Sequence, residues 1–259
     1  MNEISETELL ELCEAAARAG GDHALKNMHR CAEAAERFDH DIKLVMDSEC
    51  QRLIESMILA RFPDHTILGE EGSVANSTAY EWVVDPIDGT SNYTRQFPYW
   101  CCSVAVRRAG EMLAGCVYVP ALNECYTATA SGTALCNGNK IQPAATSTLK
   151  DAALFTGLTK DMDVRTFSFF TDAAPRVNKI RILGSAAIDV CHVACGRSDA
   201  FFEAGLFVWD IAAAGLIAAR AGAVCTEYQR GEEHGLRFLC TTPAVHAEMK
   251  ELVEKHFGN

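Results

Sequence analysis

Apolar strand-length runs and helical stretches alternate along the second half of this chain, and this alternation restricts the fold more than any other feature of the sequence. From about residue 151 the pattern predicts strands at 152–156, 179–183, 199–203 and 237–240, and helices near 161–174 and at 185–196, 210–222 and 243–256. Strands separated by helices are typical of sheets that helices cover. We therefore expect a mixed α/β fold.

The first half predicts helices followed by an antiparallel meander. Ser5 and Glu8 form a capping-box pattern at the start of one helix, and a second helix runs from about Asp47 to Arg61. Strands are expected at 66–68, 81–84, 101–107, 112–119 and 124–128, and a turn at Asn137-Gly138. The polar stretch 142–148 is the best candidate boundary, so we expect an N-terminal α+β lobe over 1–145 and a C-terminal α/β lobe over 146–259.

Charge and composition exclude several classes of partner. Acidic residues outnumber basic ones 35 to 23, and a formal charge of −12 repels polyanions, so we expect no nucleic-acid partner. No apolar segment approaches the roughly 20 residues that span a bilayer, and the N-terminus is acidic where a signal peptide is basic. We expect a cytoplasmic protein without a membrane partner.

The 12 cysteines are scattered through apolar stretches and include no CxxC pair. This distribution favours reduced, buried thiols over a disulfide framework. Cys191, His192 and Cys195 could share a helical face as soft metal ligands, but ordinary helix packing is the better interpretation because only three such residues occur together.

The densest group of unusual residues is 85–92, at the end of the apolar strand 81–84. Pro86 and Gly89 favour a sharp turn there, so Asp85 and Asp88 are directed from a strand end into one small volume. Thr90 or Ser91 begins a helical turn whose free N–H groups suit an anion. The plain interpretation is a turn followed by a helix cap, whereas carboxylates beside anion-binding amides indicate a divalent cation between them.

Other carboxylates occupy similar positions. Glu70 and Glu71 follow the strand 66–68, Asp41 and Asp47 precede the second helix, and Asp210 stands at the start of an Ala-rich helix. Taken singly, the glutamates are typical of an exposed loop, and Asp47 and Asp210 are typical helix N-caps.

Together these segments resemble the inositol monophosphatase family of magnesium-dependent, lithium-sensitive phosphatases. Residues 85–93 match the family pattern Asp-Pro-Ile/Leu-Asp-Gly-Thr-x-Asn-Phe, with Tyr93 as the final aromatic residue. Glu70-Glu71 matches the family's Gly-Glu-Glu position, and Trp209-Asp210 matches its C-terminal signature. The resemblance covers nearly the whole chain and implies the layered αβαβα sandwich that the family shares with fructose-1,6-bisphosphatase.

The resemblance also implies roles for individual residues. The implied ligands of two or three Mg²⁺ ions are Glu70, Asp85, the Ile87 carbonyl, Asp88 and Asp210. Glu70, Thr90 and Asp47 would activate and orient the attacking water. The implied substrate contacts are Asp88, Gly89, Thr90, Ser91 and Asp210 on the phosphate side, and Gly184, Ser185, Ala186 and Glu203 on the alcohol side. One departure is Leu44, where many members carry Thr. Lys43 beside it either faces away from the site or contacts the substrate phosphate.

The expected reaction is hydrolysis of a phosphate monoester by a metal-activated water, without a covalent intermediate. The favoured substrate is inositol 1-phosphate, within a class of small phosphorylated polyols or amino alcohols. Histidinol-phosphatase, fructose-1,6-bisphosphatase and 3′-phosphonucleotide phosphatase are the alternatives within the same superfamily. A catalytically weak metal-binding interaction protein is the non-enzymatic alternative. The resemblance further implies a homodimer.

Overall fold

The computed structural model describes residues 4–37, 42–76, 79–158, 163–229, 231 and 233–258. The α-helices of these residues are α1 (Glu6–Lys26), α2 (Val45–Arg61), α3 (Thr90–Thr94), α4 (Val164–Ala173), α5 (Ala186–Ala194), α6 (Val208–Ala221) and α7 (His246–Phe257). Single turns of 3-10 helix lie at Met28–Arg30, Pro120–Leu122, Leu149–Asp151 and Pro243–Val245.

An eight-stranded and a five-stranded sheet carry the fold, and β1 (Ala34–Arg37) pairs with β2 (Ile42–Leu44) beside them. The larger sheet has the order β10-β9-β8-β7-β6-β5-β3-β4. Its strands are β3 (Thr66–Gly69), β4 (Gly72–Val74), β5 (Tyr80–Asp88), β6 (Cys101–Arg108), β7 (Glu111–Val119), β8 (Glu124–Thr129), β9 (Leu135–Cys136) and β10 (Asn139–Lys140). β3 and β5 run parallel, and the other neighbours are antiparallel.

The smaller sheet has the order β12-β11-β13-β15-β14. Its strands are β11 (Ala153–Thr156), β12 (Lys179–Ile182), β13 (Ala200–Phe207), β14 (Val224–Gln229) and β15 (Gly235–Thr241). β11 is parallel to both of its neighbours, because a helix follows each of β11 and β12 before the next strand.

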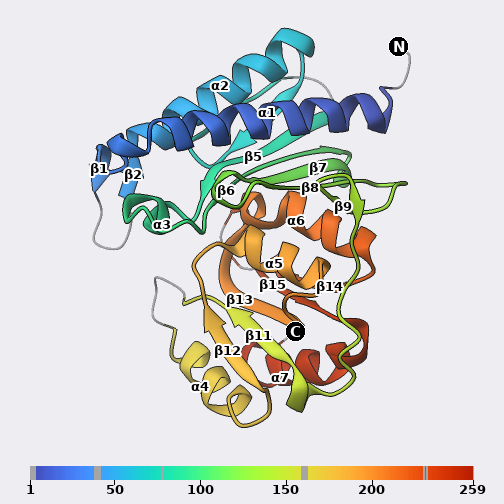
Figure 1. Cartoon of the computed structure of the whole chain (residues 1–259). Coiled ribbons are helices and arrows are strands. Elements are labelled where there is room, and N and C mark those ends of the chain that lie inside the picture. The colour runs from blue at the N-terminus through green and yellow to red at the C-terminus, as the bar shows by residue number, and fades with distance from the viewer. Residues whose placement is uncertain are drawn as a thin grey trace.

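Five layers stack along the molecule (Figure 1). Helices α1 and α2 cover one face of the larger sheet, α5 and α6 lie between the two sheets, and α4 and α7 cover the far face of the smaller sheet. This arrangement is the αβαβα sandwich that the family resemblance implies.

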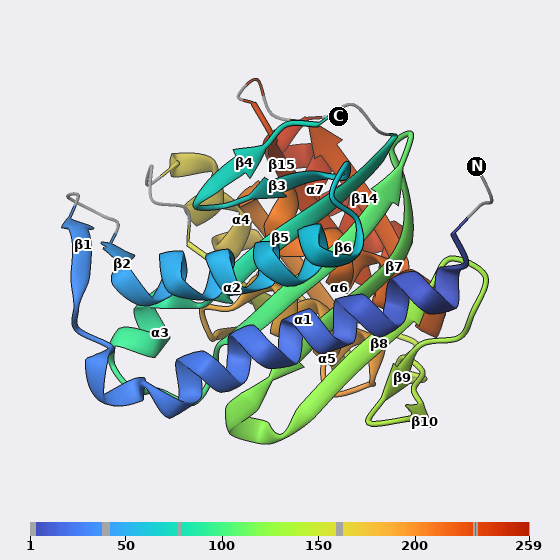
Figure 2. The same ribbon diagram turned by 90° about the horizontal axis from the view of Figure 1, so that it is seen from above.

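Successive side chains of β5 point to opposite faces of the larger sheet, and both faces are covered by helices. Trp82 and Val84 pack with the apolar residues of α1 and α2, which lie across the strands in Figure 2. Val83 packs with the residues of α5 and α6 on the opposite face. A strand that is buried on both faces has to be apolar at successive positions, as 82–84 is.

The structure corrects the sequence predictions at three places near the end of β5 and the starts of α2 and α6. The strand does not end before Asp85, because β5 continues through Pro86 to Asp88 with an irregular register. Helices α2 and α6 begin two residues earlier than predicted, so Asp47 and Asp210 are third helical residues and not N-caps. The short strands β1, β2, β4, β9 and β10 and the longer β14 were not predicted.

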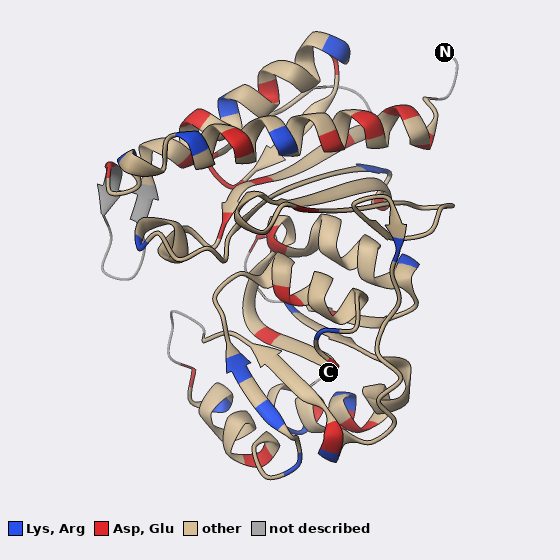
Figure 3. Ribbon diagram, viewed as in Figure 1, with Lys and Arg blue, Asp and Glu red and all other residues tan. Residues whose placement is uncertain are grey.

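Acidic side chains are spread over α1 and α2, whereas β12 carries the basic pair Lys179 and Arg181 (Figure 3). Within the described part of the chain, no helix combines the length and apolar character needed to cross a membrane. The cysteines are free thiols and are buried, apart from the partly exposed Cys136, Cys195 and Cys225.

Candidate metal centre

Three carboxylates from distant parts of the chain converge where β5 ends beside the first turn of α6. One oxygen from each of Asp85, Asp88 and Asp210 lies within 4.8 Å of the other two. Asp85 and Asp88 are buried, and Asp210 is partly buried. Hard carboxylate oxygens at this spacing are the donor set that suits Mg²⁺ or a similar divalent cation.

A bulge in β5 brings the first two carboxylates together. Asp85 pairs with Ser103 and Asp88 with Cys101, so β5 contains one more residue than β6 between these points. Residues three apart in a regular strand point to opposite faces, and the extra residue removes that opposition. The Ile87 N–H also donates to Asp85 Oδ1 at 3.1 Å, which orients this carboxylate.

Asp88 is oriented by the start of α5, from the other half of the chain. The Ser185 hydroxyl and the Ala187 N–H donate to Asp88 Oδ2 at 2.6 and 2.7 Å. Ser185 is also the N-cap of α5, and its Oγ accepts from the Ile188 N–H at 3.5 Å. The Ser185 hydroxyl thus connects the helix terminus directly to the carboxylate cluster.

Asp47 and Asp210 occupy equivalent positions in their helices. Each is the third helical residue and accepts a bond from the amide preceding its helix, from Leu44 N at 2.9 Å and from Phe207 N at 2.7 Å. The side chain of Leu44 is buried with Ile87, so an apolar contact replaces the hydroxyl expected of a family Thr. The side chain of Lys43 and the whole of Asp41 lie outside the described part of the chain.

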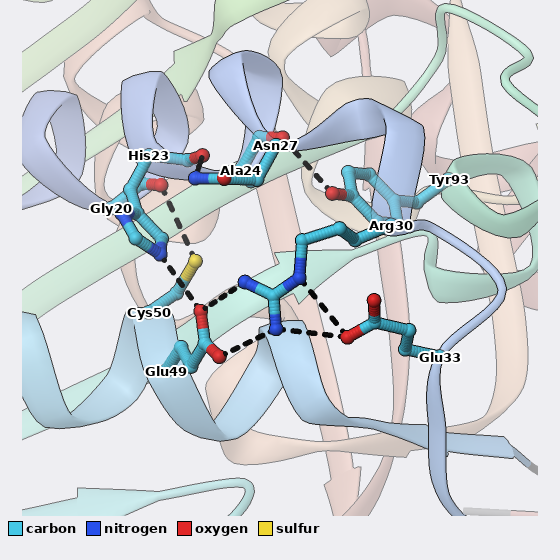
Figure 4. A network of polar contacts seen from close by, with 9 residues as sticks. All are labelled: Gly20, His23, Ala24, Asn27, Arg30, Glu33, Glu49, Cys50 and Tyr93. Atoms are coloured by element: carbon cyan, nitrogen blue, oxygen red, sulfur yellow. Dashed lines mark hydrogen bonds and ion pairs between the residues drawn. The ribbon is translucent and has the colours of Figure 1, made fainter.

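An ion-pair network anchors the start of α2 to the end of α1 (Figure 4). The Arg30 guanidinium donates to both carboxylate oxygens of Glu49 at 2.9 and 3.0 Å and also binds Glu33. His23 contacts the same Glu49 carboxylate at 3.1 Å. These partners, Arg30 first, lower the pKa of Glu49 to about 2. Asp47 is therefore carried on a helical turn that is fixed from the side facing α1.

Glu70 reaches the cluster from the strand beside β5. It directly follows β3, which is parallel to β5, and its N–H donates to the Val84 carbonyl at 3.1 Å. This pairing places Glu70 next to Asp85. Burial, and then the negative charge of Glu70, raise the pKa of Asp85 well above its usual value.

The three aspartates are difficult to ionise together in the absence of a cation. Burial is the main reason why the pKa values of Asp85, Asp88 and Asp210 are all raised, and the neighbouring carboxylates add to the rise for Asp85 and Asp210. The bonds from Ser185 and Ala187 oppose the rise for Asp88. A bound divalent cation offsets this repulsion and allows the carboxylates to ionise together.

The turn after Asp88 contains the residues expected to face the phosphate. Gly89 has φ +95°, and a Cβ there would lie 3.0 Å from the Tyr99 carbonyl oxygen, so a larger residue is strained. The Thr90 hydroxyl donates to the Ile87 carbonyl at 3.0 Å, which joins two of the predicted site residues, and Ser91 is exposed.

Asn92 connects this turn to the second half of the chain. Its side-chain amide donates to the carbonyls of Tyr99 and Leu183 at 2.7 and 2.8 Å. Gly184 and Ala186 therefore lie close to the turn that follows β5, with Gly184 exposed and Ala186 buried. The structure brings the predicted phosphate and alcohol sides together through this amide.

Glu203, on β13, depends on a glycine that the sequence analysis missed. A Cβ on Gly157, which directly follows β11, would lie 2.2 Å from the Glu203 carboxyl carbon. The carboxylate therefore occupies the space of a missing side chain. Burial, and then the charge of Asp88, raise the pKa of Glu203 to about 8. A glycine that directly follows a predicted strand is the signal that could have identified Gly157.

Replacing Gly157 by Ala should displace the Glu203 carboxylate without unfolding the protein, because a glutamate side chain can rotate away from the new methyl group. We expect an increase of about tenfold in KM for the preferred phosphate ester, with little change in kcat. Steady-state kinetics at saturating Mg²⁺ provide the measurement. A fall in kcat with unchanged KM would contradict a role on the substrate side.

A buried polar chain behind the cluster also escaped the sequence analysis. The Tyr99 hydroxyl donates to Asp189 Oδ1 at 2.6 Å and contacts His192 Nδ1 at 3.2 Å, while His192 Nε2 faces Arg197 at 3.4 Å. Both ring nitrogens of His192 thus have protein partners. Among the described residues, the side chains that lie close enough together to share a metal ion are Asp85, Asp88 and Asp210. The alternative of a soft-metal site at Cys191, His192 and Cys195 was therefore wrong.

Comparisons with known proteins agree with this geometry. The sequence model of the inositol monophosphatase family matches residues 5–257. A protein of Xylella fastidiosa named Nus factor SuhB is 35% identical over an alignment of 257 positions that covers 94% of this chain and 94% of its own. An inositol monophosphatase of Dictyostelium discoideum is 32% identical over 253 residues, covering 92% of this chain and 93% of its own. The solved IMPase of Thermotoga maritima is similar with a TM-score of 0.85 and 31% identity, over 95% of this chain and 96% of that one.

Proposed function

The chain belongs to the inositol monophosphatase family, and from this premise we propose that it hydrolyses a small phosphate monoester with the help of Mg²⁺, inositol 1-phosphate being the favoured substrate. The family comprises metal-dependent phosphatases that act on phosphorylated substrates. The observation that carries the proposal is the convergence of Asp85, Asp88 and Asp210 within 4.8 Å, beside Glu70.

Glu70, Asp85, the Ile87 carbonyl, Asp88 and Asp210 would hold two or three Mg²⁺ ions. These ions supply a Lewis acid and an activated water when bound. Without them the cluster would repel a phosphate dianion, because its carboxylates carry the same sign of charge. The aspartate positions are set by β5 and by the starts of α5 and α6, so the protein contributes a prearranged ligand set.

The chain's own groups would position the nucleophile and the phosphate. Thr90, with its hydroxyl on the Ile87 carbonyl, would orient the attacking water together with Glu70 and Asp47. Gly89, Thr90 and Ser91 would donate to the phosphate oxygens from the turn after β5. Ser185 would act chiefly through the bond that it donates to Asp88.

On the alcohol side, Gly184 and Ala186 would form a small-residue wall and Glu203 would accept bonds from hydroxyl groups. Once Glu203 is ionised, a second phosphate near it would meet like charge, which disfavours fructose 1,6-bisphosphate. Histidinol phosphate is the strongest rival, because its ammonium group could pair with Glu203 and is attracted by the net charge of −12.

The test of function is phosphate release from four esters with and without Mg²⁺: inositol 1-phosphate, histidinol phosphate, fructose 1,6-bisphosphate and 3′-phosphoadenosine 5′-phosphate. We expect the largest kcat/KM for inositol 1-phosphate and no turnover after chelation. Glu203→Gln should reduce that kcat/KM by about tenfold, since one hydrogen-bond acceptor is weakened. A tenfold preference for histidinol phosphate that disappears in Glu203→Gln would replace the inositol assignment.

The same assay decides between the enzyme and the non-enzymatic alternative. Several relatives bear the name Nus factor SuhB, which is not the name of a phosphatase. A chain that binds Mg²⁺ yet releases no phosphate from any of the four esters would favour the interaction protein. The homodimer and the cytoplasmic location remain part of the proposal, and light scattering after size-exclusion chromatography measures the first.

Lithium inhibition is expected from family membership. A Li⁺ ion in a position vacated by Mg²⁺ beside Asp210 would retain the product phosphate, so inhibition should strengthen with substrate concentration. Titration of Li⁺ at saturating substrate provides the measurement, and Asp210→Asn should shift the inhibition constant. Full activity at high Li⁺ concentration would remove the protein from the lithium-sensitive members without contradicting hydrolysis.

A further inference from the structure

Gln51 is a buried amide that contacts the turn carrying Glu70. It lies on α2 one helical turn after Asp47, and its side chain is only 4% exposed. Its Oε1 accepts from the Glu71 N–H at 2.9 Å, and its Nε2 donates to the Gly72 carbonyl at 3.0 Å. Nε2 also donates to Glu55 Oε1, on the next turn of α2, at 2.8 Å.

These three bonds fix the orientation of the amide. A flipped amide would direct its oxygen at the Gly72 carbonyl and the Glu55 carboxylate, and its NH₂ group at the Glu71 N–H. All three contacts would then be repulsive. The side chain therefore holds the backbone on the C-terminal side of Glu70 in one arrangement.

The close approach of the amide depends on Gly69, on the N-terminal side of Glu70. A Cβ on Gly69 would lie 2.5 Å from the side-chain oxygen and nitrogen of Gln51. Gly69, the last residue of β3, thus has no side chain at the point where Gln51 contacts it. One side chain of α2 contacts both flanks of the proposed metal ligand, while Glu70 itself is bound through its N–H to β5.

We propose that Gln51 is a positioning residue that holds the Gly69–Gly72 turn so that the Glu70 carboxylate reaches Asp85, and that it thereby sets the affinity of the metal centre. The inference rests on the proposed function for the identity of Glu70 as a ligand. Outer residues that orient a ligand typically contribute 10- to 100-fold to metal affinity. Gln51 touches neither the metal nor the substrate in this assignment and acts through Glu70.

The test is a titration with Mn²⁺, in which electron paramagnetic resonance measures the signal of the free ion. This binding measurement requires no turnover. Gln51→Met keeps the length and burial of the side chain and removes its three hydrogen bonds. We expect the Mn²⁺ dissociation constant to rise about tenfold. Tyr126→Phe is the matched control, because it removes a buried hydroxyl that bonds to Glu124 at 2.6 Å on β8, with β7, β6 and β5 between it and β3.

A double-mutant comparison separates positioning from general destabilisation. In a Glu70→Gln background, Gln51→Met should have almost no further effect on Mn²⁺ binding. The reason is that Gln51 acts on the metal through the Glu70 carboxylate, which this background lacks. Gly69→Ala, which displaces the amide from the other side, is the second variant if Gln51→Met does not fold.

Three outcomes would overturn the proposal: unchanged Mn²⁺ affinity in both Gln51→Met and Gly69→Ala, an equal loss in Tyr126→Phe, or full additivity with Glu70→Gln. The proposed function fails separately, when the wild-type chain binds Mn²⁺ but releases no phosphate from the four esters. The binding results on Gln51 are then still decisive for its positioning role.

Discussion

Replacing Asp88 by Asn is expected to lower kcat by about a thousandfold, equivalent to about 4 kcal/mol of transition-state stabilisation. Asp88 belongs to the converging set with Asp85 and Asp210, so the change removes one charged ligand from the centre of the site. The measurement is the rate of phosphate release at saturating ester and several Mg²⁺ concentrations.

The fold should survive this substitution. An Asn side chain can place its amide oxygen where Asp88 Oδ2 accepts from Ser185 and Ala187, so both bonds are retained. Loss of one negative charge also relieves repulsion within the metal-free cluster. We therefore expect the unfolding temperature of the metal-free variant to equal or exceed that of the wild type.

Asp189→Asn is the matched control for Asp88→Asn. Asp189 is also a buried acid beside the site, but its described bond is to the Tyr99 hydroxyl, which an Asn oxygen can still accept. We expect Asp189→Asn to change kcat by less than about threefold, because the ligand set is intact. Near-normal turnover in Asp88→Asn, or equal losses in the two variants, would contradict the metal-centre assignment.

Without metal, the protein should lose stability as the pH rises from 7 to 8.5. Burial raises the pKa of Glu203 to about 8, and it raises the pKa values of Asp85 and Asp210 well above their usual range. The folded state therefore holds protons that the unfolded state has already released near pH 4. Because the folded state binds more protons than the unfolded state, the free energy of unfolding falls as the pH increases through the folded-state pKa.

The pH window avoids opposing groups. The pKa of His192 is lowered to about 4 by burial, so this residue adds stability with rising pH only up to its unfolded pKa of about 6.5. The pKa of Glu49 is lowered to about 2 by Arg30, and its contribution is complete above about pH 5. Between pH 7 and 8.5 both contributions are constant.

Adding Mg²⁺ should abolish this pH dependence, because the bound ions keep the carboxylates deprotonated in the folded state, as they already are in the unfolded state. At a Mg²⁺ concentration about 100 times the dissociation constant, the gain is about 2.7 kcal/mol. Denaturant unfolding at pH 7 and 8.5, with and without Mg²⁺, measures both effects. Glu203→Gln is expected to reduce the metal-free pH dependence without removing it, because Asp85, Asp210 and buried thiols also hold protons in the folded state. A metal-free stability that rises with pH would contradict the assignment of raised pKa values.

The local elements follow from the sequence because their causes are local. The Ser5 cap, the apolar alternation of 101–128 and the small residues after Asp210 depend on neighbours within a few positions, and the corresponding helices and strands lie close to where they are predicted. The motif at 85–93 also identified the family, since its residues are contiguous. The order of the layers came from that resemblance and is confirmed by the three cores between them.

Positions set by contacts between distant segments were not available from the sequence. The bulge at Pro86 appears only against the register of β6, and Gly157 matters only because Glu203, on another strand, fills its empty side.

Gln51 is an ordinary helical residue until α2 packs beside the turn that follows β3. The raised pKa of Glu203 likewise requires burial near Asp88, which chain folding alone produces. The sequence by itself determined which carboxylates and turns were present and the family to which they belong. Only the tertiary structure decided how those groups are oriented, because hydrogen bonds, steric space and burial between remote segments exist only once the layers have packed.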